Sequence, residues 1–377
     1  MKKATLRLAA LAIIIGGTIN ETTAQVTGVV NNIKVITTAV PMLRISPDAR
    51  ATGMGETGIA TSADAYSNFW NLGKTPFAKQ NASFGLTYTP WLHDLNLKDV
   101  YLTSLAGFYK MGDAQAISLG LRYFSLGNID FTTIAGTPDG SSRPREFSLD
   151  LGYSRKLSSK TGIGLGLKYV SSSLAVGNYG GINYKKGSSV SGDLHLYHTG
   201  AKENGEGLNW GLTLSNLGSK ISYTDNSAKK DFIPANLGLG GAYTKVFDAD
   251  SKLTFALDLN KLLVPLDTSA GGTAGYQTKS VVSSWTKSFG DKSGETKEIT
   301  AGIGAEYTYK DQFSLRAGYF YENKLKGDRR YATVGAGLKY SMVGLNIAYI
   351  VPSGSGVTRT PLSNTFRLSL MFDIDKK

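Results

Sequence analysis

The chain has 377 residues, with 41 Lys and Arg against 29 Asp and Glu, and it contains no Cys. The absence of Cys excludes disulfides, thiolate metal sites and a Cys nucleophile. Charged residues make up 19% of the chain, and Gly contributes 45 residues. The fraction of charged residues is therefore lower, and the fraction of Gly higher, than is usual in soluble domains. This balance is unusual for a cytosolic enzyme.

The N-terminus has the pattern of a secretory signal peptide. Lysine and arginine residues precede a wholly apolar run over 8–15, and small residues lead to Ala24. The apolar run is too short to cross about 30 Å of hydrocarbon as a helix. We therefore expect residues 1–24 to be a signal peptide that is cleaved after Ala24 during export.

Residues 25–80 differ from the rest of the chain. They show no strong strand alternation and carry many small residues, yet they include Met54, Phe69, Trp70 and Phe77. Large apolar side chains favour a packed segment over a disordered tail. We expect 25–80 to be a hatch, or plug, folded into the periplasmic end of the structure that follows.

From residue 81 to 377, apolar residues recur at every second position. This is the pattern of strands with one apolar face. The expected strands span about 82–89, 99–110, 117–123, 147–153, 163–169, 188–198, 208–214, 235–245, 253–259, 298–309, 312–321, 331–340, 342–350 and 366–372. No run is long enough for a transmembrane helix. The pattern predicts an all-β, 14-stranded antiparallel barrel in the outer membrane of a Gram-negative cell.

The connections and strand ends agree with a barrel. Short connections, such as 111–113 and 247–250, alternate with long ones, such as 126–143 and 263–296, and in such barrels the long loops lie outside the cell. A soluble all-β protein has no reason to keep this asymmetry. Every second strand, beginning with 99–110, ends in an aromatic residue, which predicts a girdle at the inner interface. These residues are Tyr109, Tyr153, Tyr197, Tyr243, Tyr309, Tyr340 and Phe372.

The polar face of the strands should point into the lumen. Its charges are of both signs, which favours paired, structural charges over a pore selective for one sign of ion. Many glycines on this face leave room for the plug. The candidate lumen and plug-contact residues are Arg122, Asp150, Lys168, Asp193, Asp258, Glu306, Arg316, Lys339 and Arg367.

Motifs that resemble catalytic or cofactor sites lack the context that they need. Gly53 to Gly58 fits G-x-G-x-x-G, but no βαβ unit surrounds it. His195 and His198 would point to opposite faces of a strand, and His93 lies in a predicted outer loop. We expect no catalytic, cofactor or metal site. Basic residues form no stripe, so we expect no nucleic-acid partner; the basic loops better suit lipopolysaccharide or a protein.

The longest connection, 263–296, contains a short amphipathic stretch with near-helical spacing. An exposed apolar patch of this kind often marks a protein contact. The alternative is a helix folded over the barrel mouth. The candidate partner-binding residues of the outer loops are Val281, Val282, Trp285, Phe289 and, in the first long connection, Trp91.

Several stretches resemble the PorV (LptO) family of the type IX secretion system. They are 41–50 (PMLRISPDAR), 53–55, 60–62, 87–92, 115–118, 121–127, 146–147 and 153–157. The resemblance runs from about Pro41 to the C-terminus and implies a FadL-like barrel with an N-terminal hatch. Of the Asn-Pro-Ala of FadL-type hatches, only Asn71 is matched.

The resemblance also implies a function without catalysis. Proteins of this family act as outer-membrane shuttles, which bind exported proteins through their C-terminal signal domain beside a large translocon barrel. They then pass the cargo to a surface attachment complex, where the signal is cleaved and lipopolysaccharide is joined. The alternative function is that of a FadL-type transporter of hydrophobic small molecules.

Overall fold

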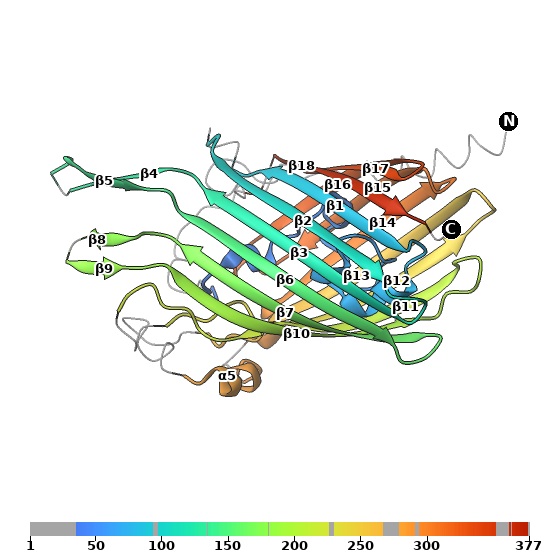
Figure 1. The fold of residues 1–377 in the computed structure, drawn as a ribbon, viewed down its shortest axis with the longest axis horizontal. Coiled ribbons are helices and arrows are strands. Elements are labelled where there is room, and N and C mark those ends of the chain that lie inside the picture. Colours follow the sequence, from blue (N-terminus) through green and yellow to red (C-terminus); the bar gives the residue numbers. More distant parts are fainter. Residues whose placement is uncertain are drawn as a thin grey trace. The chain divides into compact units, whose positions relative to one another are not determined.

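The computed structural model describes residues 35–92, 97–133, 135–179, 181–225, 230–266, 279–290, 294–351, 362 and 364–375. In this part of the chain, fourteen antiparallel strands close into a barrel (Figure 1). The expected fold is therefore confirmed. Residues 1–34 lie outside the described residues, so the signal peptide and its cleavage after Ala24 remain predictions.

The strands of the barrel agree closely with the segments expected from sequence. They are β1 (Ala82–Pro90), β2 (Val100–Lys110), β3 (Gln115–Leu126), β6 (Arg145–Lys156), β7 (Thr161–Ser173), β10 (Gly187–Thr199), β11 (Gly207–Gly218), β12 (Asn236–Val246), β13 (Ser251–Leu262), β14 (Ile299–Tyr309), β15 (Phe313–Tyr321), β16 (Arg330–Tyr340), β17 (Val343–Ile350) and β18 (Thr365–Ile374). Sequence neighbours pair around the barrel, and β1 pairs with β18 to close it. Closure leaves no free edge, so the strands' backbone groups can all be paired in lipid.

Period-two alternation determines which side chains face lipid. On β13, Leu257 is 47% exposed on the outer surface, whereas its neighbours Ala256 and Asp258 are buried. The same alternation runs along the other strands. The structure therefore has an apolar exterior and a largely polar interior. Within the described residues, no helix combines the length and apolarity of a membrane span.

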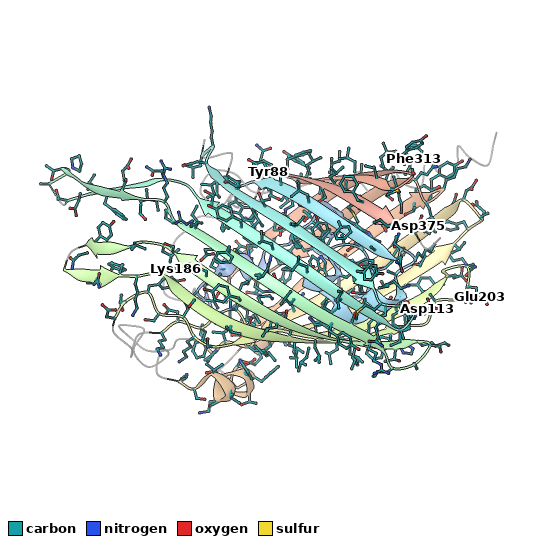
Figure 2. All side chains as sticks on the ribbon, in the orientation of Figure 1. Tyr88, Asp113, Lys186, Glu203, Phe313 and Asp375 are labelled. Atoms are coloured by element: carbon teal, nitrogen blue, oxygen red, sulfur yellow. The ribbon has the colours of Figure 1, made fainter. Side chains whose placement is uncertain are left out.

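The two rims of the barrel differ as expected. Short turns such as 157–160 and 247–250 lie at one rim, together with Asp113, Glu203 and Asp375 (Figure 2). Lys186 lies toward the other rim, from which long connections extend. The elements in these connections are β4 (Ile129–Thr132), β5 (Pro138–Ser142), β8 (Gly177–Tyr179), β9 (Ile182–Tyr184), α5 (Val281–Lys287) and η5 (Glu295–Glu298).

The expected aromatic girdle has one exception, Tyr197. The other six aromatic residues have exposed side chains, but Tyr197 is only 3% exposed. It shares its parity with Asp193 and His195, which also face inward, and its ring centroid lies 5.7 Å from that of Phe77. The assignment of Tyr197 to the girdle was wrong because strand parity directs this side chain to the lumen.

The described part of the predicted hatch contacts the inside of the barrel. Its helices are η2 (Pro41–Arg44), α2 (Ala49–Gly53), α3 (Ser67–Trp70) and η3 (Leu72–Phe77). Helix α2 contacts β15 to β18, whereas η3 contacts β6, β7 and β10 on another part of the wall. The hatch is not confined to the periplasmic end, because Met42 and Leu43 pack with Trp91 and Phe124 at the outer end.

An outward arginine at the middle of β13 should strongly destabilise the barrel. We expect Leu257→Arg to lower the free energy of unfolding by about 2–4 kcal/mol, the range for Arg at the bilayer midplane. Leu157→Arg, at an exposed leucine of a short turn, should cost about 0–1 kcal/mol. Urea unfolding from lipid vesicles measures both. Equal losses would contradict the assignment of the outer face.

Candidate functional site

Glycines of the wall allow the hatch backbone to lie directly against it. A Cβ atom on Gly304 would lie 2.2 Å from the carbonyl oxygen of Met54, and one on Gly318 would lie 2.1 Å from the backbone nitrogen of Gly55. Across the barrel, a Cβ on Gly162 would lie 2.4 Å from the carbonyl oxygen of Gly73. Glycine permits such close backbone approach. The backbone of the hatch therefore packs directly against these lumenal glycines.

A buried ion-pair cluster joins α2 to β14 and β15. The guanidinium of Arg50 lies 3.0 Å from Asp64 Oδ2 and 2.8 Å from Glu306 Oε1. The other carboxylate oxygen of Glu306 lies 2.6 Å from Arg316 Nε, and Arg316 Nη1 also donates to Asn346 Oδ1 at 2.9 Å. Because Glu306 and Arg316 are buried and Arg50 is largely covered, breaking one pair leaves an uncompensated charge. The cluster fixes α2 to the wall.

A second cluster lies on β3, β6, β7 and β10. Lys168 Nζ lies 3.3 Å from Asp150 Oδ1 and 3.1 Å from Asp193 Oδ2. Arg122 Nε lies 4.0 Å from Asp150 Oδ2, and Arg122 Nη1 donates to the carbonyl oxygen of Met42 at 3.3 Å. Charges of the wall thus neutralise one another and also bind the hatch backbone.

Other predicted charges bind the hatch or the rim. Asp258 Oδ2 accepts hydrogen bonds from the backbone nitrogens of Gly58, at 2.7 Å, and Ile59, at 2.9 Å. Arg367 Nη1 donates to Thr52 Oγ1. Lys339 Nζ is 2.6 Å from Asp373 Oδ2. Each of the predicted lumenal charges therefore has a partner: Arg122, Asp150, Lys168, Asp193, Asp258, Glu306, Arg316, Lys339 and Arg367.

Two hatch residues that sequence reasoning did not single out as contacts organise this region. Asp48 Oδ1 accepts from the backbone nitrogen of Ala51 at 2.8 Å, and Oδ2 accepts from Trp70 Nε1 at 2.8 Å. An Asp before a short helical run is an N-cap signal, so this role could have been found. Asn71 Nδ2 donates to the carbonyl oxygen of Leu196 at 2.9 Å, a partner that no local pattern reveals.

The histidines do not form a metal site in the described residues. His195 faces the lumen, where its Nδ1 accepts a hydrogen bond from the backbone nitrogen of Leu72 at 2.8 Å. His198 faces outward and stacks on Trp210, with ring centroids 5.5 Å apart. The described residues contain no cluster of three or more metal-ligand side chains. His93 lies outside the described residues.

A small space lies between the hatch and the wall at one place. Beside Phe69, Arg122 and Asp150 it amounts to about 10 Å³, which is room for about one water molecule. A larger hollow of about 280 Å³ lies on the outer surface, lined by Leu315, Ile347 and neighbouring apolar residues. The larger space therefore faces lipid.

Two hairpins project from the rim of long connections (Figure 1). The rings of Phe131, in β4, and Tyr179, in β8, have centroids 4.6 Å apart, so the hairpins contact each other. Hydrogen bonds from Lys185, at 2.9 Å, and Asn183, at 3.0 Å, bind Asp225 of the next connection and lower the pKa of its carboxyl. Exposed apolar residues of this ridge include Ile129, Ile182 and, just before β8, Val176.

The predicted partner-binding residues differ in their exposure to solvent. Val282 and Phe289 are exposed, Trp285 is half-buried, and Val281 packs against Phe232 and Val264. Partner binding by this segment remains a prediction. Trp91 is different.

Trp91 is only 8% exposed, and its ring packs edge-on against Phe124 with centroids 5.9 Å apart. The hatch residues Met42 and Leu43 belong to the same apolar cluster. Its assignment to an exposed partner surface was wrong, because the hatch reaches the outer end of the barrel and covers this ring.

Removal of the Glu306 charge should weaken the attachment of the hatch. We expect Glu306→Gln to lower the free energy of unfolding by about 3–5 kcal/mol, because buried guanidinium groups lose their shared carboxylate. The control Asp311→Asn removes an exposed partner of Lys252 and Lys79 and should cost about 0–1 kcal/mol. Urea unfolding measures both variants; a loss at Glu306 no larger than at Asp311 would show that the buried cluster is dispensable.

Comparison with solved structures shows a shared fold. The Ralstonia pickettii toluene transporter TbuX is 14% identical, with a TM-score of 0.56 over 92% of this chain and 100% of that chain. The Pseudomonas putida toluene transporter TodX is 13% identical, with a TM-score of 0.52 over 88% and 99%. At these identities the likeness concerns the fold alone, a closed β-barrel.

The sequence also identifies a family. No curated protein matches the chain significantly. Residues 29–269, more than half of the chain, match the family described as Type IX secretion system protein PorV. The barrel expected of that family is the one that the structure has. The chain therefore belongs to the PorV family of outer-membrane proteins of the type IX secretion system.

Proposed function

We propose that this barrel is a non-enzymatic carrier for exported proteins. It binds cargo through the C-terminal signal domain beside the translocon barrel of the type IX system and delivers it to the surface attachment complex. The family match over residues 29–269 carries this proposal. The location in the outer membrane supports it, because a carrier must reach both the translocon and the cell surface.

The plugged lumen supports binding outside the barrel. Hatch backbone lies against wall glycines on two sides, and the wall charges Glu306, Lys168 and Asp193 form ion pairs. A transporter of hydrophobic small molecules needs a passage with room for its ligand. The tight contacts of the described hatch disfavour this alternative, although the fold is shared with proteins named as toluene transporters.

We place the partner-binding surface on the two projecting hairpins. The ridge formed by β4–β5 and β8–β9 exposes Ile129, Val176 and Ile182 at the rim of long connections. Exposed apolar residues grouped on one feature are typical of protein contacts. Basic residues of neighbouring connections, such as Lys186, are suited to anionic lipopolysaccharide near the same rim.

A deletion strain of the source organism distinguishes carrier from transporter. Without the gene, we expect proteins with the C-terminal signal domain to remain unprocessed inside the cell, and the wild-type gene to restore their export. Normal export together with lost uptake of apolar small molecules would contradict the carrier and support the transporter.

Complementation with Val176→Asp/Ile182→Asp tests the binding surface. A tag at the C-terminus leaves the hairpins free, because β18 ends at the opposite rim. We expect roughly tenfold less cargo to copurify with this variant, because apolar contacts at an interface centre dominate binding. The matched control is Leu157→Asp at the short-turn rim, which should bind cargo normally. Unchanged binding by the hairpin variant, at equal amounts of folded barrel, would place the surface elsewhere.

A further inference from the structure

Helix α5 turns its apolar side away from the protein. Ser284 and Ser288 are buried, whereas Val282 is 65% exposed and Phe289, just after the helix, is 51% exposed. Trp285 lies on the same side as these two residues, at spacings of three and four. A helix on a water-facing surface normally buries its apolar stripe and exposes its polar one. The arrangement in α5 is the reverse.

The hydroxyl groups of the two buried serines have hydrogen-bond acceptors within their own segment. Ser284 Oγ donates to the carbonyl oxygen of Ser280 at 2.7 Å, and Ser288 Oγ donates to that of Trp285 at 2.8 Å. Bonds of this kind satisfy a hydroxyl within its own helix. On the inner side, Val281 packs against Phe232 and Val264. Val281 and the serines thus lie on the buried side of the helix, while Val282 and Phe289 stay exposed among the described residues.

The end of this segment lies on the outside of the barrel wall. On β13, Asp258 and Asn260 bind hatch residues inside the lumen, so strand parity directs Lys261 to the outer side. There it is covered, because its Nζ lies 2.9 Å from Glu295 Oε2 and 2.6 Å from Glu298 Oε2. Its Nζ lies 5.3 Å from the ring centroid of Phe289. The lipid-facing Leu257 is four residues away on the same strand, about 13 Å along it. Figure 1 shows α5 clear of the barrel strands, beside their outer ends.

The charged residues of the segment 279–290 are all basic. Residues 279–290 contain Lys279 and Lys287 and no acidic residue. Interfacial helices combine Lys with Trp and Phe, because the aromatic rings enter the boundary of the acyl chains while the cations meet anionic head groups.

We propose that α5 is an interfacial anchor that binds the outer leaflet of the membrane. Val282, Trp285 and Phe289 contact acyl chains, and Lys279 and Lys287 contact the phosphate groups of the surrounding glycolipid. The anchor fixes the depth of the outer rim and is independent of cargo binding. A protein partner for this side, as the sequence suggested, is the competing occupant.

Tryptophan fluorescence in vesicles tests this proposal. Trp70 and Trp91 are buried in the barrel, and Trp210 faces outward on β11. The full chain is reconstituted as wild type, as Trp210→Phe and as Trp210→Phe/Trp285→Phe. The difference between the two variants isolates Trp285, and the difference between wild type and Trp210→Phe supplies a lipid-facing reference. Each is measured in phosphatidylcholine vesicles with and without brominated acyl chains.

We expect brominated lipid to quench roughly half of the Trp285 emission, as for Trp210, and aqueous iodide to have little effect. Quenching by iodide alone would overturn the proposal and leave the apolar side free for a protein partner. Quenching by neither agent would also overturn it, because Trp285 would then be buried in the barrel's own loops. The aromatic substitutions are conservative, and folding of each variant is checked by its resistance to urea.

Discussion

The backbone of the hatch lies directly on glycines of the barrel wall, and most of the architecture follows from that contact. Gly55 adopts a φ of +69° and approaches β14 so closely that a Cβ would lie 2.5 Å from the carbonyl oxygen of Ile303. Side chains on Gly304 or Gly318 would exclude the hatch from this position. The close fit in turn brings Arg50 to Glu306, so buried charges that would be costly alone are neutralised.

The close contacts between the described hatch and the wall direct attention to the outer surface. The barrel shares its fold with proteins named as toluene transporters, yet the same fold supports different functions because function depends on the sites that it carries. In this chain the distinctive features are on the outer rim: two contacting hairpins and a helix with its apolar side outward. We assign the hairpins to protein partners and the helix to lipid, which separates cargo binding from anchoring.

Local patterns predicted the wall well because strand alternation and turn length depend on neighbours in sequence. The inward charges were also recognisable from parity. Their hatch partners were not, because Arg50 and Glu306 are 256 residues apart and no local rule pairs them. Trp91 and Tyr197 were misassigned for a related reason: both pack against the hatch, and its path through the barrel is set by tertiary contacts. Tyr197 lies four residues after Asp193 on the same strand, so the inward direction of Asp193 would have predicted an inward side chain at Tyr197.

Electrical conductance of the full-length protein in a planar lipid bilayer tests the central claim most directly. The account predicts no stable open channel across the physiological range of salt and voltage, because the hatch is held by glycine contacts on two sides and by buried ion pairs. Insertion is verified independently by the protection of the strands from protease. A steady open conductance from inserted, folded protein would contradict the account, since it would require a continuous aqueous path past the hatch.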